Sequence, residues 1–176
     1  FLTDGDHVIL GAKDDAGVVS LSVDHNGNRY GLVVSHESHN HPSQIVPYEG
    51  AATGVGGNVR DVCCMGAEVM SLGDSLRFGD IDRNKTKWIS DGVVSGIAGY
   101  GNPLGIPNIC GDLYFDKEYN ENCLVTVLTA GVVKEKNVIR SKAPKNSVNY
   151  DLILVGKPTD NSGFGGASFA SLELEE

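Results

Sequence analysis

The chain has 176 residues, of which 40% are hydrophobic and 21% are charged, and its formal net charge is −9 at pH 7. This length suits one domain, or one domain with part of another, of ordinary globular composition. An acidic chain lacks the basic surface that nonspecific nucleic-acid binding requires, and the sequence contains neither an apolar run of membrane-spanning length nor a signal-peptide pattern. We therefore expect a soluble, cytoplasmic protein that binds neither nucleic acid nor membranes.

Strand and helix patterns alternate along the first part of the chain. Four strands are predicted, at residues 8–10, 17–23, 29–35 and 69–72. The Asn26-Gly27 pair, which readily takes positive φ, predicts a turn between the second and third strands. Apolar residues at helical spacing predict a helix over 51–65, ended by Gly66. Pro42 and Pro47 predict an extended or turned chain ahead of this helix.

The second part of the chain continues the alternation. A helix is predicted over 86–100, ended by Gly101-Asn102-Pro103. Further elements are expected as strands at 106–115, 124–133 and 151–155, a polar linker at 135–149, a glycine-rich turn at 160–166 and a helix from 167. This order indicates an α/β or α+β fold. Because the first residue is Phe1 and the last predicted helix is cut short, we expect a fragment of a longer protein.

Four cysteines occur, at positions 63, 64, 110 and 123. Adjacent cysteines in a helix point about 100° apart, which does not suit one metal ion. The spacings match neither a zinc site nor a disulfide framework. We expect free, buried thiols.

The segment Glu37-Ser38-His39-Asn40-His41-Pro42 is the strongest candidate for a functional site. Its two histidines are two residues apart and would share one face of an extended chain. A zinc site would need a third soft ligand, and none stands at a suitable spacing. Proton transfer or substrate hydrogen bonding therefore suits the histidines better.

Glu37 and Asp61 carry the oxygen ligands that Mg²⁺ prefers. The alternative is a solvated Glu37 and an Asp61 paired with Arg60 on a helix surface. Asp14-Asp15 and Asp112 are further acidic candidates, with turn or edge roles as the alternative.

A run of glycines, Gly50, Gly54, Gly56 and Gly57, follows the histidine segment. It has no P-loop lysine and does not form a dinucleotide-binding fingerprint. Two explanations stay open, namely close approach of backbone N–H groups to a ligand and close packing of a helix on a sheet. The Asp160–Gly166 loop is likewise either a tight turn or an anion-binding nest.

The order of several motifs resembles the synthetase subunit of phosphoribosylformylglycinamidine synthase, over nearly the whole chain. The matching segments are D-D-A-G-V-V at 14–19, E-S-H-N-H-P-S at 37–43, P-Y at 47–48, G-A-A-T-G-V-G-G at 50–57, R-D at 60–61, M-G-A at 65–67, D-S-L-R-F-G at 74–79, G-D-L-Y-F-D at 111–116 and G-F-G-G-A-S-F-A-S at 163–171. The resemblance points to the small, multi-subunit form of the enzyme.

The resemblance implies an ATP-dependent ligase of purine biosynthesis. ATP phosphorylates the amide oxygen of formylglycinamide ribonucleotide, and ammonia then displaces phosphate to give the amidine. A separate glutaminase subunit supplies the ammonia, and a small bridging subunit completes the assembly. By motif position, the implied roles are His39 for acid–base chemistry, Ser38, His39, Asn40, His41 and Arg60 for substrate, Glu37 and Asp61 for Mg²⁺, and Asp74 for ATP.

The resemblance also implies a fold and a domain boundary. We expect residues 1–138 to form the N-terminal domain of the aminoimidazole ribonucleotide synthetase superfamily, a mixed sheet with helices on one face. Residues 139–176 would begin a second α/β domain. Paired copies of the first domain join their sheets in this superfamily, so two chains could form a homodimer.

The chain departs from the family at Ser35, where a lysine that contacts ATP is common. Other members of the superfamily, such as aminoimidazole ribonucleotide synthetase, selenophosphate synthetase or thiamine-monophosphate kinase, are alternatives that the E-S-H-N-H-P segment disfavours. A non-catalytic assembly module of the same enzyme is the alternative of a different class.

Overall fold

A computed structural model describes residues 4–156 and 158. Its elements follow one another as β1 (Val8–Leu10), β2 (Gly17–Val23), β3 (Arg29–Ser38), α1 (Asn40–Ile45), α2 (Pro47–Cys64), β4 (Glu68–Phe78), α3 (Asn84–Leu104), β5 (Asn108–Phe115), η1 (Lys117–Tyr119), β6 (Leu124–Lys134) and η2 (Glu135–Asn137), where η is a 3₁₀ helix.

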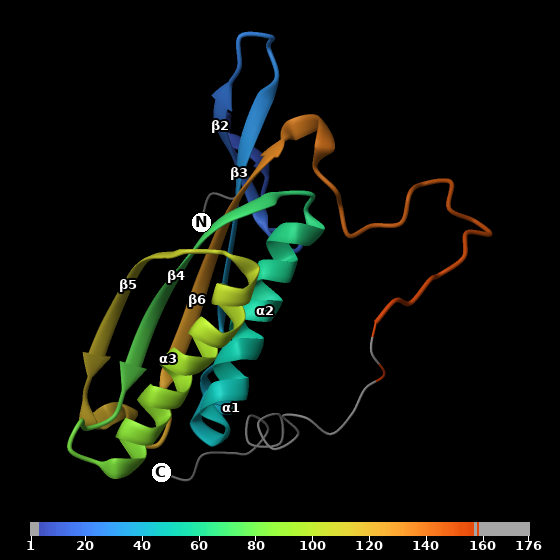
Figure 1. Cartoon of the computed structure of the whole chain (residues 1–176). Helices are drawn as coiled ribbons and strands as arrows, with labels where there is room; N and C mark the ends of the chain where they lie inside the picture. The colour runs from blue at the N-terminus through green and yellow to red at the C-terminus, as the bar shows by residue number, and fades with distance from the viewer. Residues whose placement is uncertain (1–3, 157, 159–176) are drawn as a thin grey trace.

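The strands form one mixed sheet in the order β1-β2-β3-β6-β4-β5. Only β4 and β5 run parallel, and every other neighbouring pair in this sheet is antiparallel. All three α-helices cover the same face of the sheet, whereas the opposite face carries no helix of the described chain (Figure 1). The expected mixed sheet with helices on one face is therefore confirmed.

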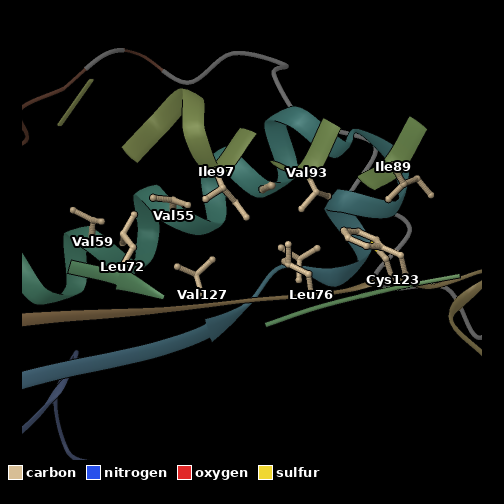
Figure 2. Close-up of a cluster of buried hydrophobic side chains, with 12 residues drawn as sticks. Val55, Val59, Leu72, Leu76, Ile89, Val93, Ile97, Cys123 and Val127 are labelled. Carbon is tan, nitrogen blue, oxygen red and sulfur yellow. The ribbon is translucent and has the colours of Figure 1, made fainter. Parts of the chain in front are cut away.

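The main core lies between the sheet and helices α2 and α3 (Figure 2). Burial alternates along β6, with Val125 and Val127 fully buried, as period-two patterning on a one-sided sheet requires. The predicted apolar stripe of α3 is confirmed, because Ile89, Val93 and Ile97 are all buried in this core. Each such side chain contributes about 1.5–3 kcal/mol to folding, so this core fixes the position of both helices.

Pro42 and Pro47 lie in helices α1 and α2, so the prediction of an extended or turned chain at these two residues is wrong. Each occupies the first turn of its helix, where the missing N–H would be unpaired in any case. The predicted stop at Gly66 is confirmed, with φ of +79° after α2. Helix α3 continues through Pro103 to Leu104 and ends at Gly105, whose φ is +69°.

The predicted strand at 151–155 is wrong, and the predicted burial of the cysteines is wrong for three of the four. Residues 151–155 are exposed and form no strand, because no described strand lies beside them. Cys63, Cys64 and Cys110 are free but exposed, and only Cys123 is buried. The predicted turn at 160–166 and the helix from 167 lie outside the described residues. No helix within residues 4–156 has the length and apolarity to span a bilayer.

Candidate active site at the end of strand β3

The candidate site is built where β3 ends and α1 begins. Strand β3 pairs with β6 as far as Ser38, opposite Thr126. Beyond it, the His39 N–H donates to the Val125 carbonyl at 2.8 Å, and the Asn40 Oδ1 accepts from the Val125 N–H at 2.8 Å. A side chain thus continues the backbone ladder for one more step, which fixes the start of α1 against the sheet.

Glu37 and His39 point toward each other on the helix-covered side of this junction. His39 Nε2 lies 3.5 Å from Glu37 Oε2, and the side chains are 22% and 38% exposed. Both are therefore held in place while still reachable from solvent. A carboxylate beside an imidazole nitrogen fixes the ring's orientation.

The glycines of α2 make this arrangement possible. A Cβ at Gly54 would lie 3.0 Å from the His39 ring, and one at Gly57 would lie 3.4 Å from Glu37 Oε2. A Cβ at Gly50 would lie 2.5 Å from the backbone of α1. The Gly50 N–H is already bonded to the Val46 carbonyl. Of the two explanations for the glycine run, the described contacts favour close packing, although the partners are α1 and the His39 and Glu37 side chains rather than the body of the sheet.

Asp61 reaches the same site from α2. Ser35 Oγ donates a hydrogen bond to Asp61 Oδ2 at 3.4 Å. Burial, followed by the neighbouring Glu37, raises the pKa of Asp61 to about 6. The carboxyl groups of Asp61 and Glu37 therefore lie side by side, and Asp61 has no arginine or lysine partner among the described residues. A cation between the two carboxylates would relieve their repulsion.

The remaining residues of the histidine segment differ in how they are held. Ser38 is exposed, while Asn40 and His41 are half-buried. The Asn40 Oδ1 accepts from the Val125 N–H, and the Asn40 NH₂ group donates to no described residue. His41 Nε2 lies 3.5 Å from Asn122 Nδ2. Arg60 is exposed on α2 beside Asp61.

Asp74 lies apart from this group. It shares a row of the sheet with Glu37, but Val127 of β6 lies between them, which corresponds to about 10 Å across two strand spacings. Asp74 lines a separate cavity of about 180 Å³ under α3 with Leu72, Ile97 and Asn108. Asn108 Nδ2 donates to Asp74, and burial raises the pKa of the Asp74 carboxyl.

Asp14 and Asp112, the other acidic candidates, each form an ion pair with an arginine. The Asp14 side chain is 1% exposed and accepts from Arg140 Nε at 2.6 Å and from Ser141. Asp112 accepts from both Arg77 terminal nitrogens at 2.6 and 2.9 Å. Arg77, followed by the Ser75 hydroxyl, holds the pKa of Asp112 at about 2. These contacts favour the turn and edge roles.

Sequence reasoning missed Asn58, which is fully buried and donates from Nδ2 to Ser35 Oγ at 3.0 Å. The available signal was a polar amide inside the apolar stripe of α2, next to Val55, Val59 and Val62. Within residues 4–156, no group of three or more His, Cys, Asp or Glu side chains is close enough to hold a metal ion alone.

Comparison with known proteins gives one family and a consistent set of relatives. Residues 13–133 match the family model described as "AIR synthase related protein, N-terminal domain". Phosphoribosylformylglycinamidine synthase subunit PurL of Methanothrix thermoacetophila is 52% identical over 99% of the chain. The chain spans only 23% of that relative's length.

Solved structures of PurL from Thermotoga maritima have the same fold. The complex with ATP matches with 44% identity and a TM-score of 0.61 over 72% of this chain and 20% of that one. The complex with FGAR matches with 44% identity and a TM-score of 0.63 over 76% and 20%. The structure described as PurLQS matches with 45% identity and a TM-score of 0.62 over 74% and 20%.

Proposed function

Because the chain belongs to the AIR synthase related N-terminal domain family, we propose that it supplies one part of the active site of an ATP-dependent ligase of purine biosynthesis. The observation that carries this proposal is the close grouping of Glu37, His39 and Asp61 at the end of β3, in a chain similar to PurL throughout its length. The PurL relatives are about four times as long, so the activity is proposed for the protein that contains all parts of the site.

The proposed reaction converts formylglycinamide ribonucleotide to formylglycinamidine ribonucleotide. The amide oxygen attacks the γ-phosphorus of ATP, and ADP leaves. Ammonia then adds to the activated carbon, and the C–O bond breaks to release inorganic phosphate. The T. maritima structures named for FGAR and for ATP support these two substrates.

His39 is the proposed proton carrier. Its ring is held by Glu37 at 3.5 Å and remains partly exposed, which suits a group that must exchange protons with a substrate. Its proposed task is to take the proton that the attacking ammonia loses. Ser38, Asn40, His41 and Arg60 would bind the substrate, with Arg60 offsetting phosphate charge in an acidic protein.

Glu37 and Asp61 are the proposed Mg²⁺ ligands. One or two carboxylates are the usual protein share of a Mg²⁺ site, with water and substrate phosphates completing it. The raised pKa of Asp61 beside Glu37 supports a fit, because a bound cation would favour the ionised pair. When bound, Mg²⁺ would neutralise charge on the phosphates of ATP.

Asp74 is proposed as a nucleotide contact. Support comes from the cavity that it lines and from the hydrogen bond with Asn108. Since Val127 separates Asp74 from Glu37, this contact would concern a part of the nucleotide away from the carboxylate pair.

The domain boundary near residue 138 is also a proposal, as are the partners. The family match ends at residue 133, and η2 ends at Asn137. We further propose a cytoplasmic assembly with a glutaminase and a small bridging subunit, which the PurLQS structure supports by its name. Self-association would use the sheet face that no helix covers, where Val19, Met70 and Tyr114 are exposed.

Amidine formation by the complete synthetase tests the proposal. His39→Ala should lower ammonia-dependent turnover by about two orders of magnitude or more. His36→Ala is the matched control, because His36 is an exposed histidine of the same strand and should leave turnover unchanged. Turnover of His39→Ala within a few-fold of the native value would contradict the assigned role.

The chain tested alone separates enzyme from assembly module. We expect the isolated 176-residue chain to be inactive, because it spans 23% of its PurL relative. Turnover by the isolated chain would show that it holds a complete site. An inactive chain that restores turnover when combined with the rest of the synthetase would support the proposal.

A further inference from the structure

Asn58 occupies a position where an apolar residue is expected. It is 0% exposed on the face of α2 that also carries Val55, Val59 and Val62. Its Oδ1 is buried and has no hydrogen-bond partner among the described residues. A buried amide with one unpaired end is unfavourable for folding relative to an apolar side chain of similar size. Stability therefore does not explain this residue.

The other end of the Asn58 amide is part of a hydrogen-bonded chain. Asn58 Nδ2 donates to Ser35 Oγ at 3.0 Å, and Ser35 Oγ donates to Asp61 Oδ2 at 3.4 Å. Ser35 is itself 6% exposed. The chain of contacts starts on α2, crosses to β3 and returns to α2 three residues later. It connects the buried Asn58 amide to the Asp61 carboxyl.

We propose that Asn58 and Ser35 are positioning residues that orient the Asp61 carboxylate for binding a divalent cation together with Glu37. Donors behind a metal ligand hold its carboxylate in one orientation, and their loss weakens metal binding even though they never contact the ion. This inference rests on the proposed role of Glu37 and Asp61 and extends it to two residues that have no assigned function.

A Mn²⁺ titration of the 176-residue chain, followed by electron paramagnetic resonance, tests the inference. Asn58→Leu keeps the volume of the side chain and removes the donor. We expect the Mn²⁺ dissociation constant to rise about tenfold, while the melting temperature without metal stays the same or rises. A purely structural Asn58 would give the reverse, with a lower melting temperature and unchanged affinity.

Two further variants sharpen the result. Ser35→Ala should weaken Mn²⁺ binding as Asn58→Leu does, and Ser35→Thr, which keeps the hydroxyl, should restore it. Thr129→Val is the matched control, because Thr129 lies opposite Ser35 on β6. Like Asn58, Thr129 is 0% exposed and has a side-chain oxygen without a hydrogen-bond partner among the described residues. Thr129→Val should leave the affinity unchanged.

The outcomes distinguish this inference from the proposed function beneath it. Native chain that binds Mn²⁺, with Asn58→Leu and Ser35→Ala binding equally well, overturns the positioning role alone. Native chain that binds no Mn²⁺, or binds it equally well after Glu37→Gln, overturns the cation role of the carboxylate pair as well.

Discussion

Two sets of carboxylates in this chain have opposite environments. Asp14 and Asp112 each accept hydrogen bonds from an arginine and a serine, and both pKa values lie below the ordinary range. Asp61 and Asp74 have no arginine or lysine partner among the described residues, and both pKa values are raised, chiefly by burial. The first set is balanced within the fold, whereas the second retains charge that a ligand could balance.

This difference distinguishes acidic residues of similar sequence context by the side chains that surround them. Asp14-Asp15 and Asp112 stand in motifs as well matched as those of Asp61 and Asp74. What distinguishes Asp14 and Asp112 from Asp61 and Asp74 is the arginine that each of the first two contacts. An aspartate that lacks a cationic neighbour in a partly buried position is destabilising by itself, and such positions are typical of functional sites.

The largest expected effect comes from Asp61→Asn. Removing one of two proposed Mg²⁺ ligands should lower amidine formation by the complete synthetase by about 100-fold or more, and should raise the Mg²⁺ concentration needed for half-maximal rate. The melting temperature should stay the same or rise, because the variant removes a carboxyl whose ionisation burial and Glu37 disfavour. An unchanged Mg²⁺ dependence would contradict the ligand role.

Asp14→Asn should lower stability and leave metal binding unchanged, which is the reverse of the result expected for Asp61→Asn. The side chain is 1% exposed and holds Arg140 and Ser141, so its loss should lower the melting temperature by about 5 °C. Mn²⁺ affinity should be retained, because Asp14 is balanced by Arg140 rather than by a ligand. A chain that melts as the native one does would show that this contact is not needed for folding.

The pH dependence of stability should distinguish the same two residues. Burial and the neighbouring Glu37 raise the folded-state pKa of Asp61 to about 6, above the ordinary aspartate value of 3.8. Its contribution to stability is therefore present at low pH and is lost as pH rises through 6. For Asp14 the folded-state pKa is lowered, so its contribution is present above the unfolded value and is lost as pH falls.

Urea unfolding between about pH 4 and pH 7, without divalent cations, measures this contrast. The stability of the native chain relative to Asp61→Asn should fall as pH rises, and the same comparison with Asp14→Asn should show no such fall. Saturating Mg²⁺ should remove the Asp61 trend. Parallel profiles for the native chain and Asp61→Asn would refute the raised pKa.

The smallest effect is expected for Asp112→Asn. Its side chain is 63% exposed, and exposed ion pairs contribute little to stability. The melting temperature should shift by about 2 °C or less, with no change in amidine formation. A larger drop in melting temperature in the complete synthetase than in the isolated chain would indicate that the Arg77–Asp112 pair contacts another part of the protein.

Periodicity predicted the sheet and both long helices because their patterns are local. Val125 and Val127 stand on either side of the polar Thr126, and Ile89, Val93 and Ile97 recur every fourth residue. The E-S-H-N-H-P segment was predicted as a site from its composition, and the structure places Glu37 and His39 together. Its helical continuation was missed because proline is tolerated in a first helical turn.

The remaining features depend on contacts between distant segments. Asn58 and Ser35 are 23 residues apart, and nothing local indicates that they meet. The separation of Asp74 from Glu37 follows from the strand order, in which β6 lies between β3 and β4 although it is the last of the six described strands along the chain. Pairing rules alone do not predict that insertion.

The hydrogen bond between the Asn40 side chain and the Val125 N–H makes local opening around His39 measurable at the Val125 amide. The Val125 N–H is held by the Asn40 side chain at 2.8 Å, not by backbone. Its hydrogen should exchange with deuterium whenever the first turn of α1 lifts away, even while the sheet stays intact. Exchange at Val125, compared with exchange at amides within the ladder, would therefore report local opening around His39 without any bound substrate.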